Sequence, residues 1–400
     1  MKKFIFGLIS WVLIAFLSLA MGEIAVRAFV AIKGRPIWVS DIYRGYKHTP
    51  HNRFVYNFNG GNVANTTDSH GFIGQEAPFL ASNALKIVMM GDSFTEALQV
   101  LWRENYCSIF EKTLNERRPP PARPVHVMNA GVSGYSPIAE FQYFRKELAS
   151  LKPDIVVLQM YANDVFEDHK AAAMGVLDKE GLPLALSKYF RRHNQVPDER
   201  NVWFRSREWL LRNSRLAEFL NRMIDKSLKK TREQTVMCSR DEFNDENQFF
   251  IIDERSPLFQ NVSFREELLS RTLFYVRKLR QEVERVGAKF MIVLIPHEAQ
   301  LSLKKYPPHV GIYFKDPPAG TYLNDRLSSF CRDEGIPFLD MKSVFDKHPG
   351  EDLYWPQDGH LRPKGHQIVG ESLGEFLTAA SSVPDRSSRS AAAILKTDSN

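Results

Sequence analysis

Cysteine is scarce in this sequence, and its scarcity limits the chemistry that the chain can use. The 400 residues include only three cysteines, Cys107, Cys238 and Cys331, which allow one disulfide at most. Their spacing does not match a metal site, and nothing supports a cysteine nucleophile. Cys107 falls inside a predicted helix, where we expect a small buried hydrophobe. Cys238 and Cys331 form the one pair to test for a disulfide.

Several other signals of ligand binding are missing as well. No cluster of histidines and carboxylates is typical of zinc, and no glycine-rich segment ending in lysine is typical of a phosphate-binding loop. We therefore expect no metal and no cofactor. The net charge of +6 is mild for this length. It is spread out apart from the run 226–232, which favours a solvated helix face over a nucleic-acid surface, so nucleic acid is not an expected partner.

The amino-terminal segment differs from the rest of the chain. After two lysines, residues 4–22 carry no charge, and as a helix they would reach roughly across the hydrocarbon core of a bilayer. Small residues at 18–20 are compatible with cleavage of a signal peptide. An uncleaved anchor over residues 1–30 is the favoured interpretation, because the apolar run exceeds a usual signal core and continues amphipathically. The lysines predict a cytoplasmic amino terminus and an extracytoplasmic, periplasmic body.

Residues 31–84 are turn-rich and polar, and they predict a lead-in of short strands and loops between the anchor and the rest of the chain. The pattern changes at Leu85, where short apolar runs begin to alternate with helical segments. Near-continuous apolar runs separated by helices indicate parallel strands that are covered on both faces. The predicted strands are residues 85–90, 125–128, 155–160, 290–295 and 337–339.

This alternation predicts an α/β fold over residues 85–380. We expect a three-layer α/β/α, flavodoxin-like, doubly wound sheet of about five parallel strands. Helices are predicted over residues 95–117, 138–150, 265–286 and 363–378.

Two segments do not fit this alternation. Residues 165–263 are too long for one crossover. An insertion at the ligand-binding edge of such a sheet usually forms a cap, so we expect an inserted helical cap over that edge, with helices around 203–230. The tail 381–400 is rich in serine, alanine and charge without apolar spacing. It is interpreted as disordered.

The tripeptide Gly91-Asp92-Ser93 directly follows the first predicted strand and precedes a helical pattern. A serine at a strand-to-helix turn exposes its hydroxyl at the carboxyl edge of the sheet, beside helix-terminal N–H groups that can receive an oxyanion. In isolation, Asp-Ser is equally well explained as a helix cap. Ser93 is the candidate nucleophile.

Two further strand ends carry candidate oxyanion donors. Gly131 follows the second strand, where a glycine lets the backbone approach a bound group and direct an N–H at it. An ordinary tight turn explains this glycine equally well in isolation. Asn163 follows the third strand and can aim its amide at a developing negative oxygen, while Asp164 can hold the loop by accepting backbone N–H bonds.

The fourth place is the segment 354–366. Asp358 and His360 are two residues apart, so in an extended segment their side chains leave from one face. A carboxylate there can hold the imidazole tautomer that takes the serine proton. His366 competes for the role of base, but it falls in the last predicted helix and is interpreted as structural. All four places lie where strands end at one sheet edge, which is where open α/β folds bind ligands.

In this chain order, the four segments resemble the SGNH hydrolase superfamily, also called GDSL-type esterases and lipases. The resemblance covers residues 86–376 apart from the insertion. It implies a catalytic triad of Ser93, Asp358 and His360, an oxyanion hole formed by Ser93, Gly131 and Asn163, and supporting roles for Asp92 and Asp164.

Two positions depart from the family pattern. Tyr161 stands where the family usually has glycine, and we expect it to narrow the pocket beside the oxyanion hole. Asp358 and His360 are separated by one residue instead of two. The shorter spacing occurs in some extracytoplasmic members that handle polysaccharide O-acetyl groups, and it keeps a different orienting carboxylate as an alternative.

These residues predict a serine esterase that acts on O-acyl esters through an acyl-enzyme on Ser93. The expected substrates are acetyl esters of an envelope or exported polysaccharide. Two alternatives remain: an O-acyltransferase that uses the same triad, and a catalytically silent member that binds glycan or scaffolds an assembly. The expected partners are an acylated small molecule or glycan and, through the amino-terminal helix, a membrane. The sequence does not indicate an oligomeric state.

Overall fold

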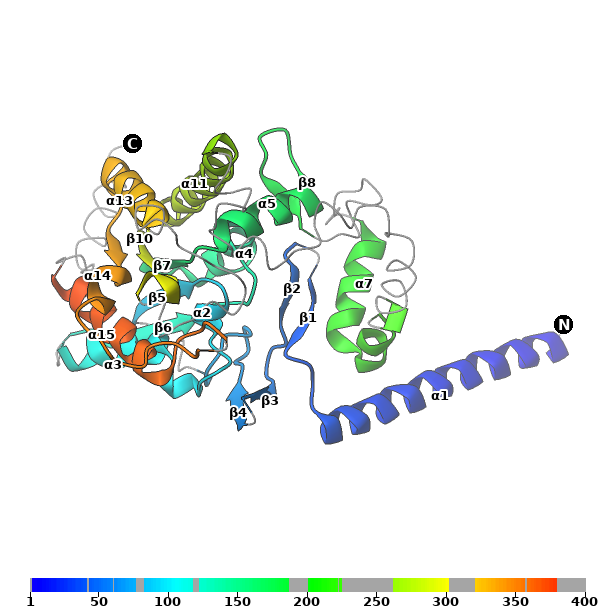
Figure 1. The fold of residues 1–400 in the computed structure, drawn as a ribbon. Coiled ribbons are helices and arrows are strands. Elements are labelled where there is room, and N and C mark those ends of the chain that lie inside the picture. The colour runs from blue at the N-terminus through cyan, green and yellow to red at the C-terminus, as the bar shows by residue number, and fades with distance from the viewer. Residues whose placement is uncertain are drawn as a thin grey trace, which may run out of the picture.

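The computed structural model describes residues 2–41, 43–59, 61–76, 83–117, 122–186, 201–221, 223–224, 262–301, 321–356 and 358–379 (Figure 1). Their centre is a five-stranded parallel sheet in the order β11-β10-β7-β5-β6. All five predicted strands are confirmed, with ends shifted by at most one residue. They are β5 (Leu85–Met90), β6 (Val125–Asn129), β7 (Ile155–Met160), β10 (Lys289–Leu294) and β11 (Phe338–Asp340).

The strand order is that of a doubly wound sheet. Counted along the chain from β5, the five strands lie in the order 2-1-3-4-5, which is the flavodoxin-like arrangement. The winding direction reverses between β5 and β7. Ligands in such folds bind outside the carboxyl ends of the strands at this point, so the loops after β5 and β7 are the first place to look for a site.

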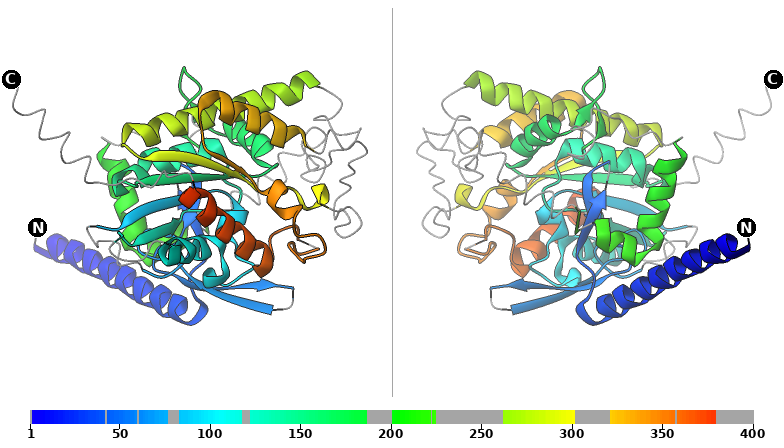
Figure 2. Two further views of the ribbon diagram at one scale, coloured as in Figure 1. Left: turned by 90° about the vertical axis from the view of Figure 1, so that its left-hand side faces the viewer. Right: turned by 90° about the vertical axis from the view of Figure 1, so that its right-hand side faces the viewer.

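Helices cover both faces of the sheet and complete the predicted three-layer α/β/α architecture (Figure 2). Their side chains enter two separate hydrophobic clusters, one on each face of the sheet. One face is covered by α3 (Tyr106–Arg117), α14 (Met341–Phe345) and α15 (Pro363–Ala379), and the other by α4 (Pro137–Lys146), α5 (Asp164–Met174), α11 (Val262–Arg285) and α13 (Tyr322–Glu334).

The central strand β5 shows why its sequence is apolar at nearly every position. Side chains alternate between the two faces of a strand, so Ile87 and Met89 enter the cluster of α3 and α15, while Val88 and Met90 enter the cluster of α4 and α11. All four side chains are completely buried. Each such burial contributes about 1.5–3 kcal/mol, which fixes the strand and with it the turn that follows.

The prediction of a single helix over residues 95–117 is wrong. Helix α2 (Ser93–Glu96) is one turn long and ends at Ala97, whose φ of 52° is left-handed. The chain then passes through the 3-10 turn η1 (Trp102–Glu104) before α3 begins. Asn105 stabilises the break, because its side chain donates to Thr95 O at 2.8 Å and accepts the Cys107 N–H at 2.8 Å. Apolar residues continue across the break, so their pattern alone predicts one helix.

The remaining predicted helices are present. Residues 138–150 correspond to α4 and the 3-10 turn η2 (Leu148–Leu151), and the two later predictions correspond to α11 and α15. The lead-in forms two antiparallel hairpins, the short strands that its turn-rich sequence predicts. They are β1 (Trp38–Asp41) with β2 (Gly45–His48), and β3 (Arg53–Phe58) with β4 (Gly61–Thr66).

The amino-terminal helix α1 (Lys2–Lys33) extends away from the α/β body (Figure 1). Its segment Ile9–Val30 is long and apolar enough to cross a membrane, and none of it is buried inside the protein. A signal sequence near the amino terminus also meets these criteria of length and composition. The helix is therefore a candidate membrane span.

The described part of the insertion consists of α5, a small hairpin and α7 (Val202–Asn213) with a second helical segment at 215–221. The hairpin pairs β8 (Val176–Leu177) with β9 (Pro183–Ala185). Helix α7 lies beside the end of α1 that is nearest the body (Figure 1). Within the described residues, nothing between 165 and 263 hydrogen bonds to Ser93, Asp358 or His360.

Three expectations concern other parts of the chain. The rest of the predicted cap, the tail 381–400 and Cys238 lie outside the described residues. Cys107 and Cys331 are both buried and carry free thiols, as expected for Cys107.

Candidate active site

Ser93 is the first residue of α2 and follows the end of β5 after two residues, Gly91 and Asp92. Gly91 has no room for a side chain, because a Cβ there would lie 2.2 Å from Thr95 Oγ1. Asp92 caps α2 by accepting the Phe94 N–H at 2.9 Å. The same turn therefore caps the helix and places Ser93 at the sheet edge, with its N–H at the open start of α2.

Ser93, His360 and Asp358 form a continuous hydrogen-bonded row. His360 Nε2 lies 2.7 Å from Ser93 Oγ, and His360 Nδ1 lies 2.6 Å from Asp358 Oδ2. The loop that carries them is tight: the N–H groups of Asp358 and Gly359 both donate to Trp355 O, at 3.1 and 2.9 Å. Gly359 has a φ of 77°, which glycine adopts readily. Through this turn, the short spacing between the carboxylate and the imidazole still brings both side chains into line with the serine.

Two opposing effects set the basicity of His360. Burial lowers the pKa of the imidazole, but its hydrogen bond to Asp358 and the negative charge of that carboxylate outweigh burial, so the pKa lies above the usual 6.5. Above this pKa the ring is neutral, with one nitrogen free to accept a proton from Ser93.

Gln99 makes a contact with the triad that no sequence motif marks. Its Nε2 donates to Asp358 Oδ2 at 3.3 Å, and the residue is only 8% exposed. Gln99 follows the break after α2, in the stretch where the sequence predicts a continuous helix. The contact depends on that break and could not be found from the periodicity.

The two expected oxyanion donors are engaged differently. Asn163 Nδ2 donates to Asp92 Oδ2 at 3.1 Å, which uses one of its two N–H groups. The N–H of Gly131 donates to Asn129 Oδ1 at 3.0 Å, within its own loop. Glycine is required at 131 because a Cβ would lie 2.4 Å from Thr95 Cβ. The structure thus brings the Gly131 loop against α2 but leaves its N–H bonded to an internal acceptor.

The two supporting aspartates are buried and hold backbone turns. Asp164 Oδ2 accepts the Tyr161 N–H at 2.8 Å, and Asp92 joins the cap of α2 to Asn163. Burial raises the pKa of both carboxyl groups. Asp92 and Asp164 therefore fix the positions of the loops after β5 and β7 relative to each other.

Tyr161 belongs to a packed row of rings behind the triad. Its ring centroid lies 4.2 Å from that of Phe94 and 5.8 Å from that of His297. Phe94 in turn lies 4.9 Å from the ring of His360. Tyr161 is only 5% exposed, so its ring packs in the interior behind Phe94, which in turn contacts the candidate base His360.

Glu298, at the start of the 3-10 turn η3 (Glu298–Gln300), is a second acidic group beside the catalytic loop. It is 7% exposed, and it accepts a 3.4 Å hydrogen bond from the Tyr161 hydroxyl. A Cβ on Gly359 would lie 3.1 Å from its Oε1. Burial raises the pKa of the Glu298 carboxyl to about 7. No motif in the sequence marks this residue.

Glu96 joins the lead-in to the loop after β6. The carboxylate is completely buried and accepts hydrogen bonds from Trp38 Nε1 at 2.9 Å and from the Ser133 N–H at 3.2 Å. His48 Nε2 lies 2.5 Å from the same carboxylate, and the Ser133 hydroxyl donates to it as well. The Tyr46 hydroxyl also donates to Ser133 O at 2.5 Å. The lead-in is therefore part of the structure that positions the Gly131 loop.

His366 does not reach the triad. It is buried in α15, its Nδ1 accepts the Tyr106 N–H at 3.3 Å, and its ring stacks on that of Tyr106. Burial lowers its pKa to about 3, so the ring stays neutral. This placement matches the structural interpretation of His366.

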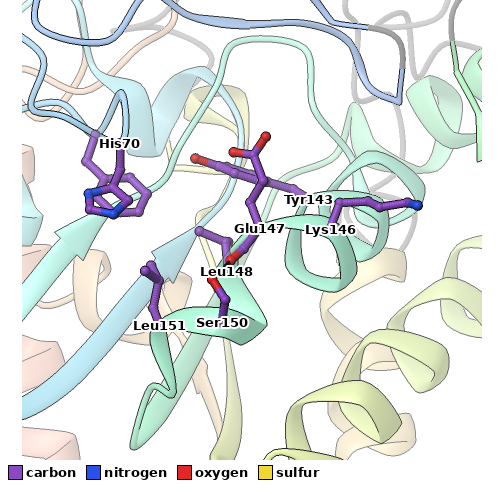
Figure 3. Close-up of a pocket in the computed structure, with 8 residues that line it drawn as sticks. His70, Tyr143, Lys146, Glu147, Leu148, Ser150 and Leu151 are labelled. Carbon is purple, nitrogen blue, oxygen red and sulfur yellow. Dashed lines mark hydrogen bonds between the residues drawn. The ribbon is translucent and has the colours of Figure 1, made fainter. Parts of the chain in front are cut away.

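A separate pocket lies between the lead-in and the end of α4 (Figure 3). Its lining includes His70, Tyr143, Lys146, Glu147 and Ser150, and no triad residue is among the lining residues. Glu147 already pairs with Arg44 at 2.7 Å. The pocket is thus distinct from the row of Ser93, His360 and Asp358.

Comparison with known proteins adds the following. No family model matches the chain, and no curated protein matches it. Among solved structures, a GDSL-like lipase from Bacteroides thetaiotaomicron is 12% identical with a TM-score of 0.36, covering 74% of this chain and 89% of its own. An acetyl xylan esterase is 12% identical with a TM-score of 0.37, covering 74% and 99%. A catalytic mutant of an acetylxylan esterase from Geobacillus stearothermophilus is 12% identical with a TM-score of 0.38, covering 73% and 93%.

Proposed function

We propose that this chain is a serine esterase of the SGNH type that hydrolyses O-acyl esters through an acyl-enzyme on Ser93. The observation that carries the proposal is the continuous row from Ser93 Oγ to His360 and Asp358, with separations of 2.7 and 2.6 Å. A serine, an imidazole and a carboxylate in this order are the elements of nucleophilic acyl transfer.

The reaction begins when His360 Nε2 takes the Ser93 proton and Ser93 Oγ attacks the ester carbonyl carbon. The tetrahedral intermediate collapses as His360 returns the proton to the departing alcohol oxygen, which leaves the acyl group on Ser93. Water then attacks the acyl-enzyme with His360 again as base. Asp358 keeps Nδ1 protonated throughout and stabilises the imidazolium.

The negative oxygen of the intermediate requires hydrogen-bond donors near Ser93. The Ser93 N–H at the start of α2 and the Asn163 amide, held by Asp92, are the two that we assign first. The Gly131 N–H is the third, and it must share or leave its bond to Asn129 Oδ1. Loss of one such donor typically costs about 3 kcal/mol in the barrier.

The proposed location follows from α1. If the uncharged part of its apolar segment Ile9–Val30 spans a membrane, the two leading lysines place the body on the extracytoplasmic side. A body tethered there meets esters of envelope or exported polysaccharide, so we propose acetylated glycans as the substrates. The O-acyltransferase alternative uses the same residues and differs only in whether water or a sugar hydroxyl accepts the acyl group.

The test compares Ser93→Ala with Ser343→Ala, an exposed serine whose hydroxyl donates to the nearby Asp340 carbonyl. Hydrolysis of a short-chain aryl ester and labelling by a fluorophosphonate probe should both be lost in Ser93→Ala and kept in Ser343→Ala. Full activity of Ser93→Ala would refute the assignment.

The same assay separates the alternatives. Acetylated glycan oligomers offered to the intact protein should release free acetate. Transfer of acetyl to an unacetylated glycan, with little free acetate, would identify an O-acyltransferase instead. Failure of the intact protein to take up the probe, combined with measurable glycan binding, would identify a catalytically silent member.

A further inference from the structure

The segment 202–224 exposes an unusual amount of apolar surface. Outside α1, the described residues include ten large hydrophobic side chains that are exposed, and eight of them lie in this segment. Trp203 is 85% exposed and Trp209 is 64% exposed. Scattered single hydrophobic residues on a surface need no explanation, but a contiguous group marks a contact with something outside the folded chain.

The exposed side chains are arranged as a face. Val202, Trp203, Trp209 and Leu210 stand at positions i, i+1, i+7 and i+8 of α7, which share one side of a helix. Phe219 and Leu220 of the second helical segment are exposed, as are Met223 and Ile224 shortly after it. Their positions i, i+1, i+4 and i+5 also share one side of a helix.

Basic residues accompany this face. By helical position, Arg205 and Arg207 flank the apolar side of α7, and both are exposed. Residues 202–224 contain five arginines and two glutamates, which is a net charge of +3. Tryptophan together with flanking arginine is the composition that favours the boundary between lipid headgroups and acyl chains.

The segment is attached to α1 where the uncharged stretch of that helix ends. Glu23 is the first charged residue after position 22, and it accepts the N–H groups of Arg215 and Leu216 at 3.0 and 2.8 Å and the Ser214 hydroxyl at 2.8 Å. Arg27 Nη2 donates to Asn213 O at 3.3 Å. The insertion therefore provides three hydrogen-bond donors to Glu23, the carboxylate that follows the uncharged stretch of α1.

The attachment also makes the two apolar surfaces continuous. A Cβ on Gly22 would lie 3.0 Å from Leu216 Cδ2, so the helices meet closely at the glycine. Leu216 shares the side of its helix that carries Phe219, Leu220 and Met223 by the i, i+3, i+4, i+7 rule. The exposed apolar face of the insertion thus begins beside Gly22, where the uncharged stretch of α1 ends.

We propose that residues 202–224 form an interfacial membrane-binding element that lies on the bilayer surface beside α1, with Trp203 and Trp209 among the acyl chains and Arg205 and Arg207 at anionic headgroups. The proposal rests on the assignment of α1 as a membrane span, and it is independent of the esterase chemistry. A soluble partner protein or a second copy of this chain would be the competing occupants of the face.

The experiment uses the full chain with Trp11→Phe, reconstituted in vesicles of phosphatidylcholine and phosphatidylglycerol whose acyl chains carry bromine. The chain contains six tryptophans, so five remain and two of these lie in the element. Bromine quenches indoles that enter the acyl region, and up to about two-fifths of the emission should be lost. Adding Trp203→Phe and Trp209→Phe should abolish most of this quenching. Adding Trp102→Phe instead removes an unquenched indole, so the quenched fraction should rise to about one half.

Alkaline extraction separates the two proposals. Protein that stays in the vesicles without quenching of Trp203 and Trp209 would overturn the interfacial element while the anchor stands. Quenching before the wash followed by release of the protein would show that Trp203 and Trp209 contact lipid but would overturn the proposed placement beside a membrane-spanning α1. Unquenched indoles with disulfide cross-linking between copies of a Trp209→Cys variant would assign the face to a second copy. Hydrolysis of a soluble short-chain ester should stay within about twofold in the double variant, because the element does not touch the triad.

Discussion

The lead-in and the segment 202–224 both lie outside the α/β layers, and they use their surfaces in opposite ways. Between residues 35 and 74, seven polar or charged side chains are buried, among them Arg44, His48 and Asn65. In the described part of 201–224, no polar side chain is buried and eight large apolar ones are exposed. The first segment places polar groups where water is absent, and the second places apolar groups where water or lipid must be present.

The comparison teaches what each segment needs in order to be stable. A buried carboxylate such as Glu96 is tolerable only with all its donors in place, so the lead-in has one arrangement against the loops after β5 and β6. The exposed apolar face of 202–224 does not need hydrogen-bond partners from the α/β body. Substitutions should therefore act on folding and catalysis in the lead-in, and on location in the insertion.

Of the substitutions considered, Glu96→Ala should have the largest effect on stability, because Glu96 holds the lead-in against the body. It leaves Trp38, His48 and Ser133 without their shared acceptor in the interior, and we expect a loss of about 3–5 kcal/mol in the free energy of unfolding. Denaturant titration measures this loss. The control is Glu375→Ala, which removes an exposed pair with Arg117 and should cost less than about 1 kcal/mol. Equal effects of the two substitutions would contradict the role assigned to Glu96.

Glu298→Gln tests a buried carboxyl that the lead-in does not reach. Burial raises its pKa from 4.5 to about 7, so the folded state keeps a proton that the unfolded state loses. The stabilising contribution is complete below pH 4.5 and disappears as the pH rises through about 7.

The glutamine variant lacks this titration. From pH 4.5 to above pH 7 it should therefore gain up to about 3 kcal/mol of stability relative to the unsubstituted protein. Unfolding measured at several pH values provides the test. A difference between the two proteins that does not change with pH would contradict the raised pKa.

The smallest expected effects come from matched tryptophan substitutions. Trp38→Phe removes the indole donor to Glu96 and should cost about 1–2 kcal/mol. Trp209→Phe changes an exposed ring and should stay within about 0.5 kcal/mol. Thermal unfolding of both variants, in detergent, compares them directly. A larger loss for Trp209→Phe would show that α7 is held by the body through contacts of that ring.

Much of the fold could be predicted because the information is local. The strands of the parallel sheet are apolar at nearly every position, and β5 is completely buried from Ile87 to Met90. The four segments that carry candidate site residues could be placed at one edge of the sheet because the carboxyl ends of parallel strands lie at the same edge. The distances that relate Ser93, Asp358 and His360 agree with that placement, and the catalytic roles of these residues stay predictions until they are tested.

What the sequence did not reveal depends on contacts between distant segments. Glu96 and His48 are 48 residues apart, and Gln99 and Asp358 are 259 apart, so no short motif joins them. The left-handed Ala97 is invisible to periodicity because alanine favours helices. The bond from the Gly131 N–H to Asn129 could not be anticipated either, since it depends on a single side-chain rotamer.

The connection between α1 and β1 has a consequence for where the chemistry can take place. Only four residues separate Lys33 from Trp38, a distance of at most about 18 Å when fully extended, and Arg35 and Pro36 in this stretch are bonded to Pro50 and Asn52. With α1 across a bilayer, as proposed, this short connection keeps the α/β body, and with it Ser93, close to the membrane surface. The active site would then reach only esters close to the bilayer surface. Esters farther out in a thick polymer layer would become substrates only when their chains approach the membrane.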